Sequence, residues 1–188
     1  MLAGGAGRRI GGDKPTRELC GRSLISYPLA AIEAAGLQAL VVAKPGTDLG
    51  DVEAEVLLEP PEPHHPLLGI ATALEGRADP IVVCPCDLPL IEPVVLAYLG
   101  RLPRSDRPIL IESDRGPEPL LGLYPPTSAR TLRELALAER PAEEVVHSPG
   151  AHRVAITRAG GSERSLLNVN APEELAQASR LLLGETPH

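Results

Sequence analysis

The chain has 188 residues, a formal net charge of −7 and 43% hydrophobic residues, but no Trp, no Phe and only three Tyr. A chain of this length can bury a core of ordinary size without disulfides or metals, so we expect a single domain over residues 1–188. The shortage of aromatic side chains excludes proteins that bind single-stranded nucleic acid by base stacking. The negative charge confines any phosphate binding to a local basic patch.

The cysteines indicate a reducing compartment, so we expect a cytoplasmic protein. Their number is odd, and Cys20, Cys84 and Cys86 match neither a disulfide framework nor a zinc-binding CxxC motif. Arginines stand near the N-terminus where a secretory signal needs apolar residues, so we expect no targeting peptide. The most apolar region, residues 81–99, is interrupted by two carboxylates and three prolines, which argues against a membrane span.

Short β-branched runs alternate along the chain with longer segments rich in Leu and Ala. This alternation predicts an α/β fold with a mostly parallel sheet and helices on both faces. The expected strands are 40–42, 56–58, 81–84, 109–111, 120–123 and 154–156. The expected helices are 23–35, starting near Ser26 because of Pro28, then 67–74, 93–99, 127–138 with a Thr127 cap, and 171–183.

The strongest local pattern is the glycine-rich segment LAGGAGRRIGGDKP at residues 2–15. It is not a Walker A loop, because an Asp precedes its lysine and a Pro follows it. It is not a dinucleotide-binding fingerprint either, because Ile10 stands where the third glycine is needed. The remaining interpretation is a loop whose amides approach a phosphate chain closely, with Arg9 and Lys14 as fixed positive charges.

Five motifs in order along the chain resemble the molybdenum cofactor guanylyltransferases, the MobA family. The first is the N-terminal LAGG with Arg9, Gly11, Asp13 and Lys14 at their present spacing. The others are HPLLGI at 65–70, CPCDLP at 84–89, the strand PLLGLY at 119–124, and NVNAPEEL at 168–175. The resemblance implies a three-layer Rossmann-like fold of the nucleotide-diphospho-sugar-transferase type. It also implies Mg²⁺-dependent transfer of GMP from GTP to molybdopterin, with release of pyrophosphate.

The residues themselves allow this chemistry. Nucleotidyl transfer depends on positioning and charge neutralisation, and a phosphate acceptor is already ionised, so no general base is required. Asp87 follows an apolar β run and comes just before a Pro, so we expect it at the carboxyl end of a strand, where a carboxylate can hold Mg²⁺. The alternative is an N-cap for the helix that begins near Pro93. We therefore expect Lys14, Arg9 and Asp87 to be catalytic, with Asp87 as the metal ligand.

The resemblance assigns further contacts to the nucleotide and its surroundings. We expect GTP to contact Leu2, Ala3, Gly4, Gly5, Lys14, Glu59 and Asp87, with Leu2 and Ala3 forming apolar walls for the base. Glu59 is equally well explained as a solvated loop carboxylate. Asn168 and Asn170 match a family segment near the active site, but Asn170 also fits the N-cap of the last helix, which we favour.

Several positions depart from the family pattern. Only Met1 precedes the LAGG motif, where a full strand is usual, and Ala43 stands where many members carry a nucleotide-contacting Asn. These differences leave alternatives open. They are cytidylyl transfer to the same pterin, nucleotidyl transfer to a sugar phosphate, a GTP-binding regulator without catalysis, and an adaptor protein. We expect GTP and molybdopterin as partners, with transient contacts to cofactor-biosynthesis proteins, and neither nucleic acid nor a membrane.

Overall fold

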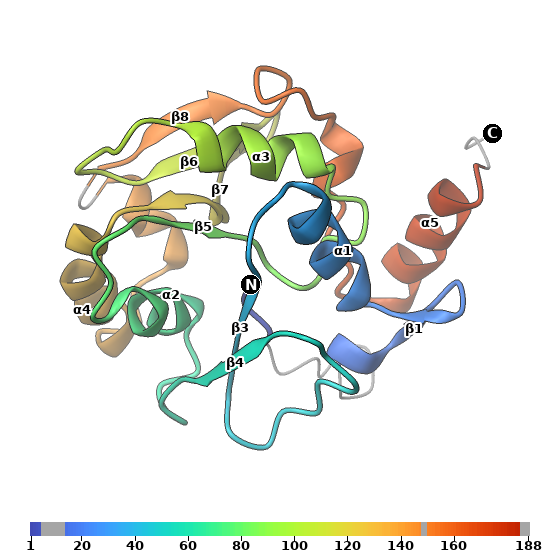
Figure 1. The fold of residues 1–188 in the computed structure, drawn as a ribbon, viewed down its shortest axis with the longest axis horizontal. Coiled ribbons are helices and arrows are strands. Elements are labelled where there is room, and N and C mark those ends of the chain that lie inside the picture. Colours follow the sequence, from blue (N-terminus) through green and yellow to red (C-terminus); the bar gives the residue numbers. More distant parts are fainter. Residues whose placement is uncertain (5–13, 148–149, 185–188) are drawn as a thin grey trace.

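The structure is a computed structural model that describes residues 1–4, 14–147 and 150–184. Its centre is a mixed β-sheet with helices on both faces (Figure 1). One part of the sheet is a parallel pair, β3 (Leu40–Ala43) and β4 (Glu55–Leu58). The other part has four strands in the order β5 (Ile81–Val83), β7 (Gly116–Tyr124), β6 (Ile109–Ser113) and β8 (His152–Ala155).

Residues 1–3 join the two parts of the sheet. Leu2 forms parallel bridges to Val42 on one side and to Pro85 on the other. The Leu2 N–H donates to the Cys84 carbonyl at 2.9 Å, and the Ala3 N–H donates to the Val42 carbonyl at 2.8 Å. The first residues therefore form a very short central strand, and the sheet runs β4, β3, residues 1–3, β5, β7, β6, β8.

One strand departs from the expected parallel arrangement. β7 runs antiparallel to both of its neighbours, β5 and β6, whereas the other pairs are parallel. β6 and β7 are separated only by Asp114 and Arg115, and so short a connection can join only antiparallel strands. Gly122 permits the close pairing, because a Cβ there would lie 2.4 Å from the Ile109 carbonyl oxygen.

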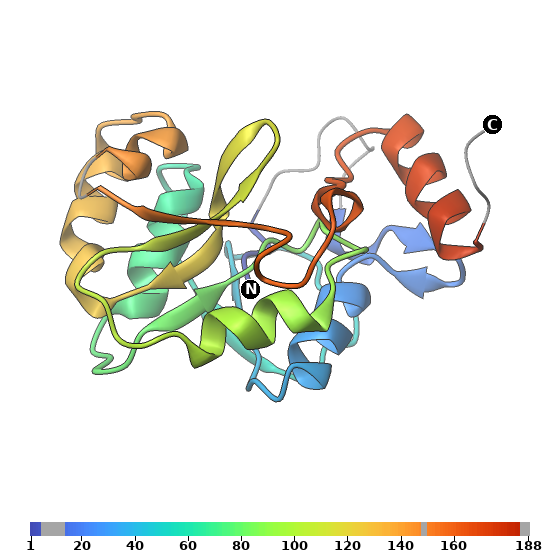
Figure 2. The same ribbon diagram turned by 90° about the horizontal axis from the view of Figure 1, so that it is seen from above.

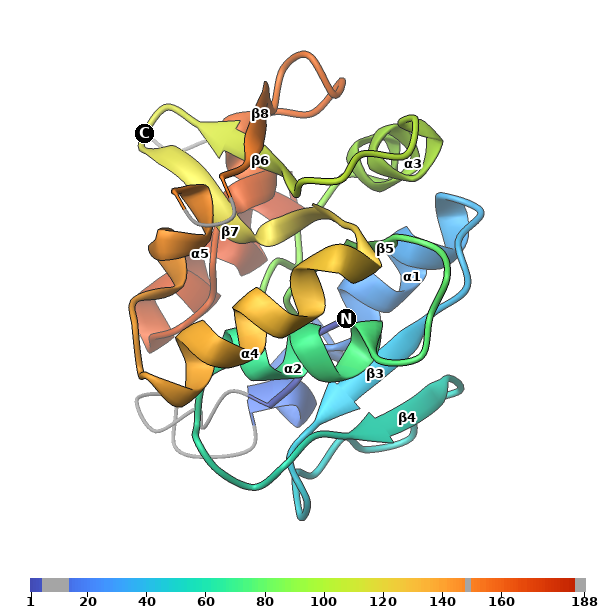
Figure 3. The same cartoon turned by 90° about the vertical axis from the view of Figure 1, so that its left-hand side faces the viewer.

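Helices cover the sheet as expected, which confirms the three-layer α/β architecture. On one face α1 (Ser26–Ala34) and α3 (Pro93–Arg101) pack over a large apolar cluster. On the other face α2 (Pro66–Leu74) and α4 (Ala129–Leu137) lie side by side over a second cluster (Figures 2 and 3). Successive residues of a strand point to opposite faces.

A smaller unit lies beside the sheet. It combines α5 (Pro172–Leu182) with a hairpin of β1 (Glu18–Leu19) and β2 (Arg22–Ser23), which the sequence pattern did not predict (Figure 1). Its small core consists of Leu19, Leu24, Val169 and Ala178. This unit brings the residues just before α5 towards the carboxyl ends of the central strands.

Most expected element positions are confirmed, with differences at the ends. α1 begins at Ser26, as the position of Pro28 required. The expected Thr127 cap of α4 is wrong, because a 3-10 turn precedes the helix and the N-cap is Ser128. The described 3-10 helices are Lys14–Thr16, Pro126–Ser128, Ala142–Val146 and Glu163–Leu166. In the part of the chain that the structure describes, no helix has the length and apolarity of a membrane span.

Candidate active site

A cavity of about 240 Å³ opens at the carboxyl ends of the parallel strands. Open α/β sheets bind their ligands at this edge, where loops from neighbouring strands converge. Its walls come from the first residues, the segments after β3, β4 and β5, the start of α2 and one residue of β7. They are Leu2, Gly4, Lys14, Lys44, Glu59, His64, His65, Pro66, Pro85, Cys86, Asp87 and Leu120.

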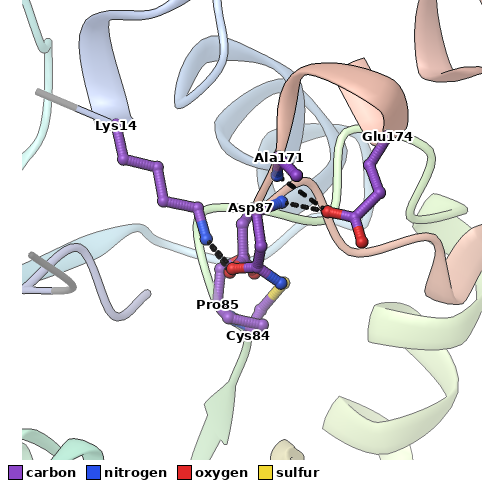
Figure 4. A network of polar contacts seen from close by, with 7 residues as sticks. Lys14, Cys84, Pro85, Asp87, Ala171 and Glu174 are labelled. Carbon is purple, nitrogen blue, oxygen red and sulfur yellow. Dashed lines mark hydrogen bonds and ion pairs between the residues drawn. The ribbon is translucent and has the colours of Figure 1, made fainter. Parts of the chain in front are cut away.

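Lys14 and Asp87 form an ion pair at this cavity. The Lys14 Nζ donates to Asp87 Oδ2 at 2.5 Å and to Asn170 Oδ1 at 2.5 Å. The two charged side chains are only 8% and 14% exposed. Figure 4 shows the Lys14 side chain pointing at Asp87, next to the residues that begin α5. An ammonium group is thus held between two oxygen atoms that could also bind a metal cation.

Asp87 is fixed by the backbone on both of its sides. Cys86 N–H donates to the Leu2 carbonyl at 3.0 Å, which continues the central ladder past β5. The Asp87 carbonyl accepts the Val169 N–H at 2.9 Å, which ties it to the segment before α5. Asp87 Oδ1 is buried without a hydrogen-bond partner among the described residues. The carboxylate therefore has one oxygen left for a ligand.

The cysteines on this strand are structural. Cys84 and Cys86 are 1% and 5% exposed and belong to the same apolar cluster, which confirms that both thiols face one side of the sheet. Burial raises the pKa of each thiol to about 12, and the negative charge of Asp87 adds to the rise. Both thiols are therefore protonated at neutral pH. A protonated thiol is neither the nucleophile nor the metal ligand that a thiolate can be.

Asn170 is not the cap of the last helix, so the interpretation we favoured from the sequence is wrong. The N-cap of α5 is Ala171, and Glu174 Oε2 accepts the backbone N–H groups of Asn170 at 2.5 Å and Ala171 at 2.9 Å (Figure 4). Because Glu174 satisfies these donors, the Asn170 side chain is free to reach Lys14. Asn168 is exposed and does not line the cavity.

A second charge pair, Lys44 and Glu59, lines the cavity from β3 and β4. Glu59 is 6% exposed, which excludes the solvated loop carboxylate considered from the sequence. Its Oε2 lies 3.7 Å from Lys44 Nζ and is buried without a hydrogen-bond partner among the described residues. Burial raises the pKa of Glu59 above its ordinary value of 4.5, and the charges of Lys44 and His64 oppose this rise.

The glycines beside Glu59 allow its carboxylate to approach the central strand. A Cβ on Gly4 would lie 2.5 Å from Glu59 Oε1, and one on Gly69 would lie 3.1 Å from Oε2. Gly4 lines the cavity as expected, and so does Leu2. Ala3 is fully buried in the opposite apolar cluster and forms no wall of the cavity, because it points to the other face of the sheet. Gly5 and Arg9 lie outside the described residues.

His65 begins α2 and closes the cavity wall. Its Nδ1 accepts the Leu67 N–H at 3.2 Å, so its ring takes the capping role that Ser or Asp usually has. Its Nε2 lies 2.7 Å from the Arg140 carbonyl. With Nδ1 an acceptor, Nε2 carries the proton and donates to that carbonyl.

Sequence reasoning missed Lys44, although the sequence contains a signal. The chain has 18 basic residues besides His, and only Lys14 and Lys44 among them are lysines. Both lysines are buried and line the same cavity, while the other 16 are arginines. A residue type used only twice was therefore a pointer to this site.

The oxygen atoms at Asp87 suit a hard cation. Mg²⁺ binds one or two protein carboxylates and takes its remaining ligands from water and substrate phosphates. Asp87 Oδ1 has no hydrogen-bond partner among the described residues, and Asn170 Oδ1 lies on the same ammonium as Asp87 Oδ2. Within residues 1–4, 14–147 and 150–184, no cluster of three or more His, Cys, Asp or Glu is placed to hold a metal. Asp87 and Asn170 thus offer carboxylate and amide oxygens of the kind that Mg²⁺ binds.

Comparisons with known proteins agree with this geometry. The model of the family described as "MobA-like NTP transferase domain" matches residues 1–155. A molybdenum cofactor guanylyltransferase from Xanthomonas euvesicatoria is 32% identical over 191 residues, covering 97% of this chain and 92% of that protein. A probable molybdenum cofactor guanylyltransferase from Methanothermobacter thermautotrophicus is 30% identical, covering 93% and 95%.

Solved structures show the same fold. The molybdopterin-guanine dinucleotide biosynthesis protein A from Archaeoglobus fulgidus superposes with a TM-score of 0.80 at 27% identity, covering 97% of each chain. The 2-C-methyl-D-erythritol 4-phosphate cytidylyltransferase from Thermus thermophilus has a TM-score of 0.64 at 14% identity, covering 97% of this chain and 96% of its own. This second likeness shows the nucleotidyltransferase fold alone. The chain belongs to the MobA-like NTP transferase family and is a nucleotidyltransferase.

Proposed function

We propose that the protein transfers GMP from GTP to the terminal phosphate of molybdopterin, releases pyrophosphate and uses Mg²⁺. The observation that supports this most strongly is that Lys14 and Asp87 form an ion pair in the wall of a cavity, with Asn170 accepting a second hydrogen bond from the Lys14 ammonium. Its relatives that are named molybdenum cofactor guanylyltransferase match along nearly their whole length. The names of these relatives support guanine as the base and molybdopterin as the acceptor. The charged groups at the cavity support phosphate chemistry.

The reaction needs one new bond and the loss of another. An oxygen of the acceptor phosphate attacks the α-phosphorus of GTP and forms a P–O bond. The bond from that phosphorus to the α,β-bridging oxygen breaks, and pyrophosphate leaves with the electron pair. The attacking phosphate oxygen is already ionised at neutral pH, so the step is accelerated mainly by positioning and by neutralising charge.

Each side chain has a defined part in this step. Asp87 and Asn170 would hold Mg²⁺ through their oxygen atoms, and the ion, when bound, neutralises charge on the transferred and leaving phosphates. Lys14 then exchanges its contacts with Asp87 and Asn170 for the triphosphate, where a compact ammonium neutralises charge as a point ion. Arg9 remains a predicted second cation. Gly5, outside the described residues, remains a predicted position where a backbone amide approaches the phosphates.

The direct test is turnover of four nucleotides in parallel. The protein is incubated with molybdopterin, Mg²⁺ and either GTP, CTP, UTP or ATP, and pyrophosphate release is measured for each. We expect release with GTP at least about tenfold faster than with the others, which corresponds to about 1.4 kcal/mol of discrimination. Faster turnover of CTP would assign the chain to cytidylyl transfer. Release without molybdopterin but with a sugar phosphate would replace the proposed acceptor.

A further inference from the structure

The Lys44–Glu59 pair has no part in the phosphate chemistry described above. We propose that Lys44 is a positioning residue that holds Glu59 at the cavity wall as an ionised acceptor for the N–H donors of the guanine base. This inference rests on the proposed function and adds to it the means by which the base is selected. Neither the family description nor the names of the relatives give Lys44 a role.

The place of the pair in the sheet separates it from the phosphate end of the cavity. Lys44 and Glu59 follow β3 and β4, which lie on one side of residues 1–3, and Asp87 follows β5 on the other side. A nucleotide with its phosphates at Lys14 and Asp87 and its base across Leu2 and Gly4 places the base edge at Glu59. The two charge pairs therefore serve opposite ends of one ligand.

Lys44 is anchored by the loop that follows Glu59. Its Nζ donates to the Pro60 carbonyl at 2.6 Å and to the Pro63 carbonyl at 2.9 Å, and it is only 7% exposed. With two of its three donors used, the ammonium is fixed 3.7 Å from Glu59 Oε2. That distance is too long for a hydrogen bond but gives a strong attraction in a buried site. Lys44 therefore sets both the position of the loop and the charge of Glu59.

Glu59 offers the acceptor that a guanine base requires. An ionised carboxylate accepts hydrogen bonds and donates none. Guanine presents adjacent donors at N1 and its exocyclic N2 amino group, whereas adenine and cytosine place an acceptor beside their single amino group. Glu59 Oε2 is buried without a hydrogen-bond partner among the described residues, which is costly unless a ligand supplies a donor. The carboxylate therefore matches guanine and repels the acceptor edges of the other bases.

The charge of Lys44 is needed because Glu59 is buried. Burial favours the neutral acid, and a protonated Glu59 would present a donor to the donors of guanine. Two charged or titratable groups act on Glu59. They are Lys44, directly after β3, and His64, in the loop that follows Glu59. After the central strand it is faced by Gly4, and from α2 by Gly69, and neither carries a charge. Lys44 is thus the buried cation that keeps the base-reading carboxylate ionised.

The test compares Lys44→Met with the wild-type protein, using GTP and ITP, which lacks only the N2 amino group. Binding is measured by calorimetry from pH 5.5 to 8, and turnover by pyrophosphate release. We expect the wild-type protein to prefer GTP over ITP about tenfold, the effect of one buried hydrogen bond to a charged group. In Lys44→Met we expect this preference to fall below about threefold, KM for GTP to rise about tenfold, and kcat to stay within about threefold.

The pH profile separates positioning from a merely structural role. GTP binding weakens as pH falls and Glu59 becomes protonated, and in Lys44→Met this weakening should begin at higher pH. Lys44→Arg keeps the charge and should restore the wild-type profile. Arg133→Met, on α4, removes the basic partner of the exposed Glu75 and is the matched control, expected to change nothing. Glu59→Gln reports independently, since it should abolish the preference for GTP over ITP even if Lys44→Met does not fold.

The two proposals fail in different ways. If the wild-type protein prefers GTP over ITP in binding and Lys44→Met loses this preference, but no pyrophosphate is released with molybdopterin, the proposed function is wrong and the role of Lys44 stands. If pyrophosphate is released but Lys44→Met changes GTP and ITP equally and leaves the pH profile in place, the role of Lys44 is wrong. An unchanged GTP preference in Glu59→Gln would overturn it as well.

Discussion

Lys14 and Asp87 are 73 positions apart in the sequence, yet the ammonium of one donates to the carboxylate of the other at 2.5 Å. This contact connects the segment after the glycine-rich motif to the end of β5, and Asn170 joins it from the residues before α5. Three distant segments therefore meet on one ammonium group. Replacing either partner of the pair should affect both catalysis and stability.

Asp87→Asn should nearly abolish activity and preserve the fold. The amide can still accept a hydrogen bond from Lys14 but loses the negative charge that a cation requires. Removing one preorganised electrostatic group typically costs about 10²–10³ in rate, and we expect a loss of pyrophosphate release in this range. Circular dichroism should be unchanged. Turnover at the wild-type rate in Asp87→Asn would show that Asp87 is not the metal ligand.

Lys14→Met should be strongly destabilising, but less so when Asp87 is also replaced. Removing one partner of a buried ion pair leaves an unpaired charge and costs about 3–5 kcal/mol. In the double variant Lys14→Met/Asp87→Asn that charge is gone, so urea unfolding should show a coupling energy of about 1–3 kcal/mol. Additive losses in the two single variants would mean that the pair is not formed in solution.

Nucleotide binding should depend heavily on the phosphates. The described cavity walls contain no Phe, Tyr or Trp to stack on a base, and their apolar part consists of Leu2, Leu120, Cys86 and two prolines. The phosphate end has Lys14 and a helical turn at residues 14–16. Calorimetry should give affinities for GTP and GDP at least about tenfold higher than for guanosine, or about 1.4 kcal/mol. Equal affinities for all three would mean that contacts with the guanosine moiety, and not with the phosphates, provide the binding free energy.

Glu92→Gln should reduce stability in a pH-dependent way. Glu92 Oε2 accepts the Ser162 N–H at 2.8 Å and the hydroxyls of Ser162 and Ser165. Burial favours the neutral acid, but these hydrogen bonds outweigh it, and the pKa of Glu92 lies below its ordinary value of 4.5. Its contribution is therefore complete above that value and is lost as pH falls through the lower pKa of the folded state.

The measurement for Glu92 is urea unfolding at several pH values. At pH 7 we expect Glu92→Gln to lose about 1–3 kcal/mol, as for hydrogen bonds to a charged group. The loss should shrink as pH falls below 4.5, where the unfolded chain takes up the proton, and should vanish below the lower pKa of the folded state. Glu112→Gln removes an ion pair with the exposed Arg153 and is the control, with an expected loss of 0–1 kcal/mol. A loss in Glu92→Gln that is independent of pH would contradict this account.

The expected strands are recovered because buried strands need local runs of apolar, β-branched residues, and such runs are visible in the sequence. The reversed direction of β7 is not visible in this way, since apolar content does not encode strand direction. It follows from the two-residue connection Asp114–Arg115. That connection can be recognised as a hairpin turn only when the last residue of β6 is known. The β1–β2 hairpin was missed because each strand has only two residues, too few for any periodicity.

The sequence predicts site residues whose role depends on their own chemical group and their position after a strand. It does not predict roles that depend on contacts between distant residues. Asp87 follows a recognisable strand, and the structure places it at the cavity with Lys14. Asn170 looked like a helix cap, because Glu173 follows it at the three-residue spacing of a capping box, but its side chain binds the Lys14 ammonium instead. Ala3 differs from Leu2 only by the alternation of a strand, which is invisible in so short a segment. Lys44 acquires its place only when Pro60 and Pro63 fold back onto it.

The three-residue strand at the start of the chain has a consequence for the whole molecule. It is the only described strand segment that hydrogen-bonds the β3–β4 pair to the four-stranded part, and Glu59 lies on one side of it while Asp87 lies on the other. A nucleotide that contacts both carboxylates would bridge this seam. Occupying the site would then strengthen the cohesion of the sheet, and loosening residues 1–3 would weaken substrate binding without touching any residue that contacts a phosphate.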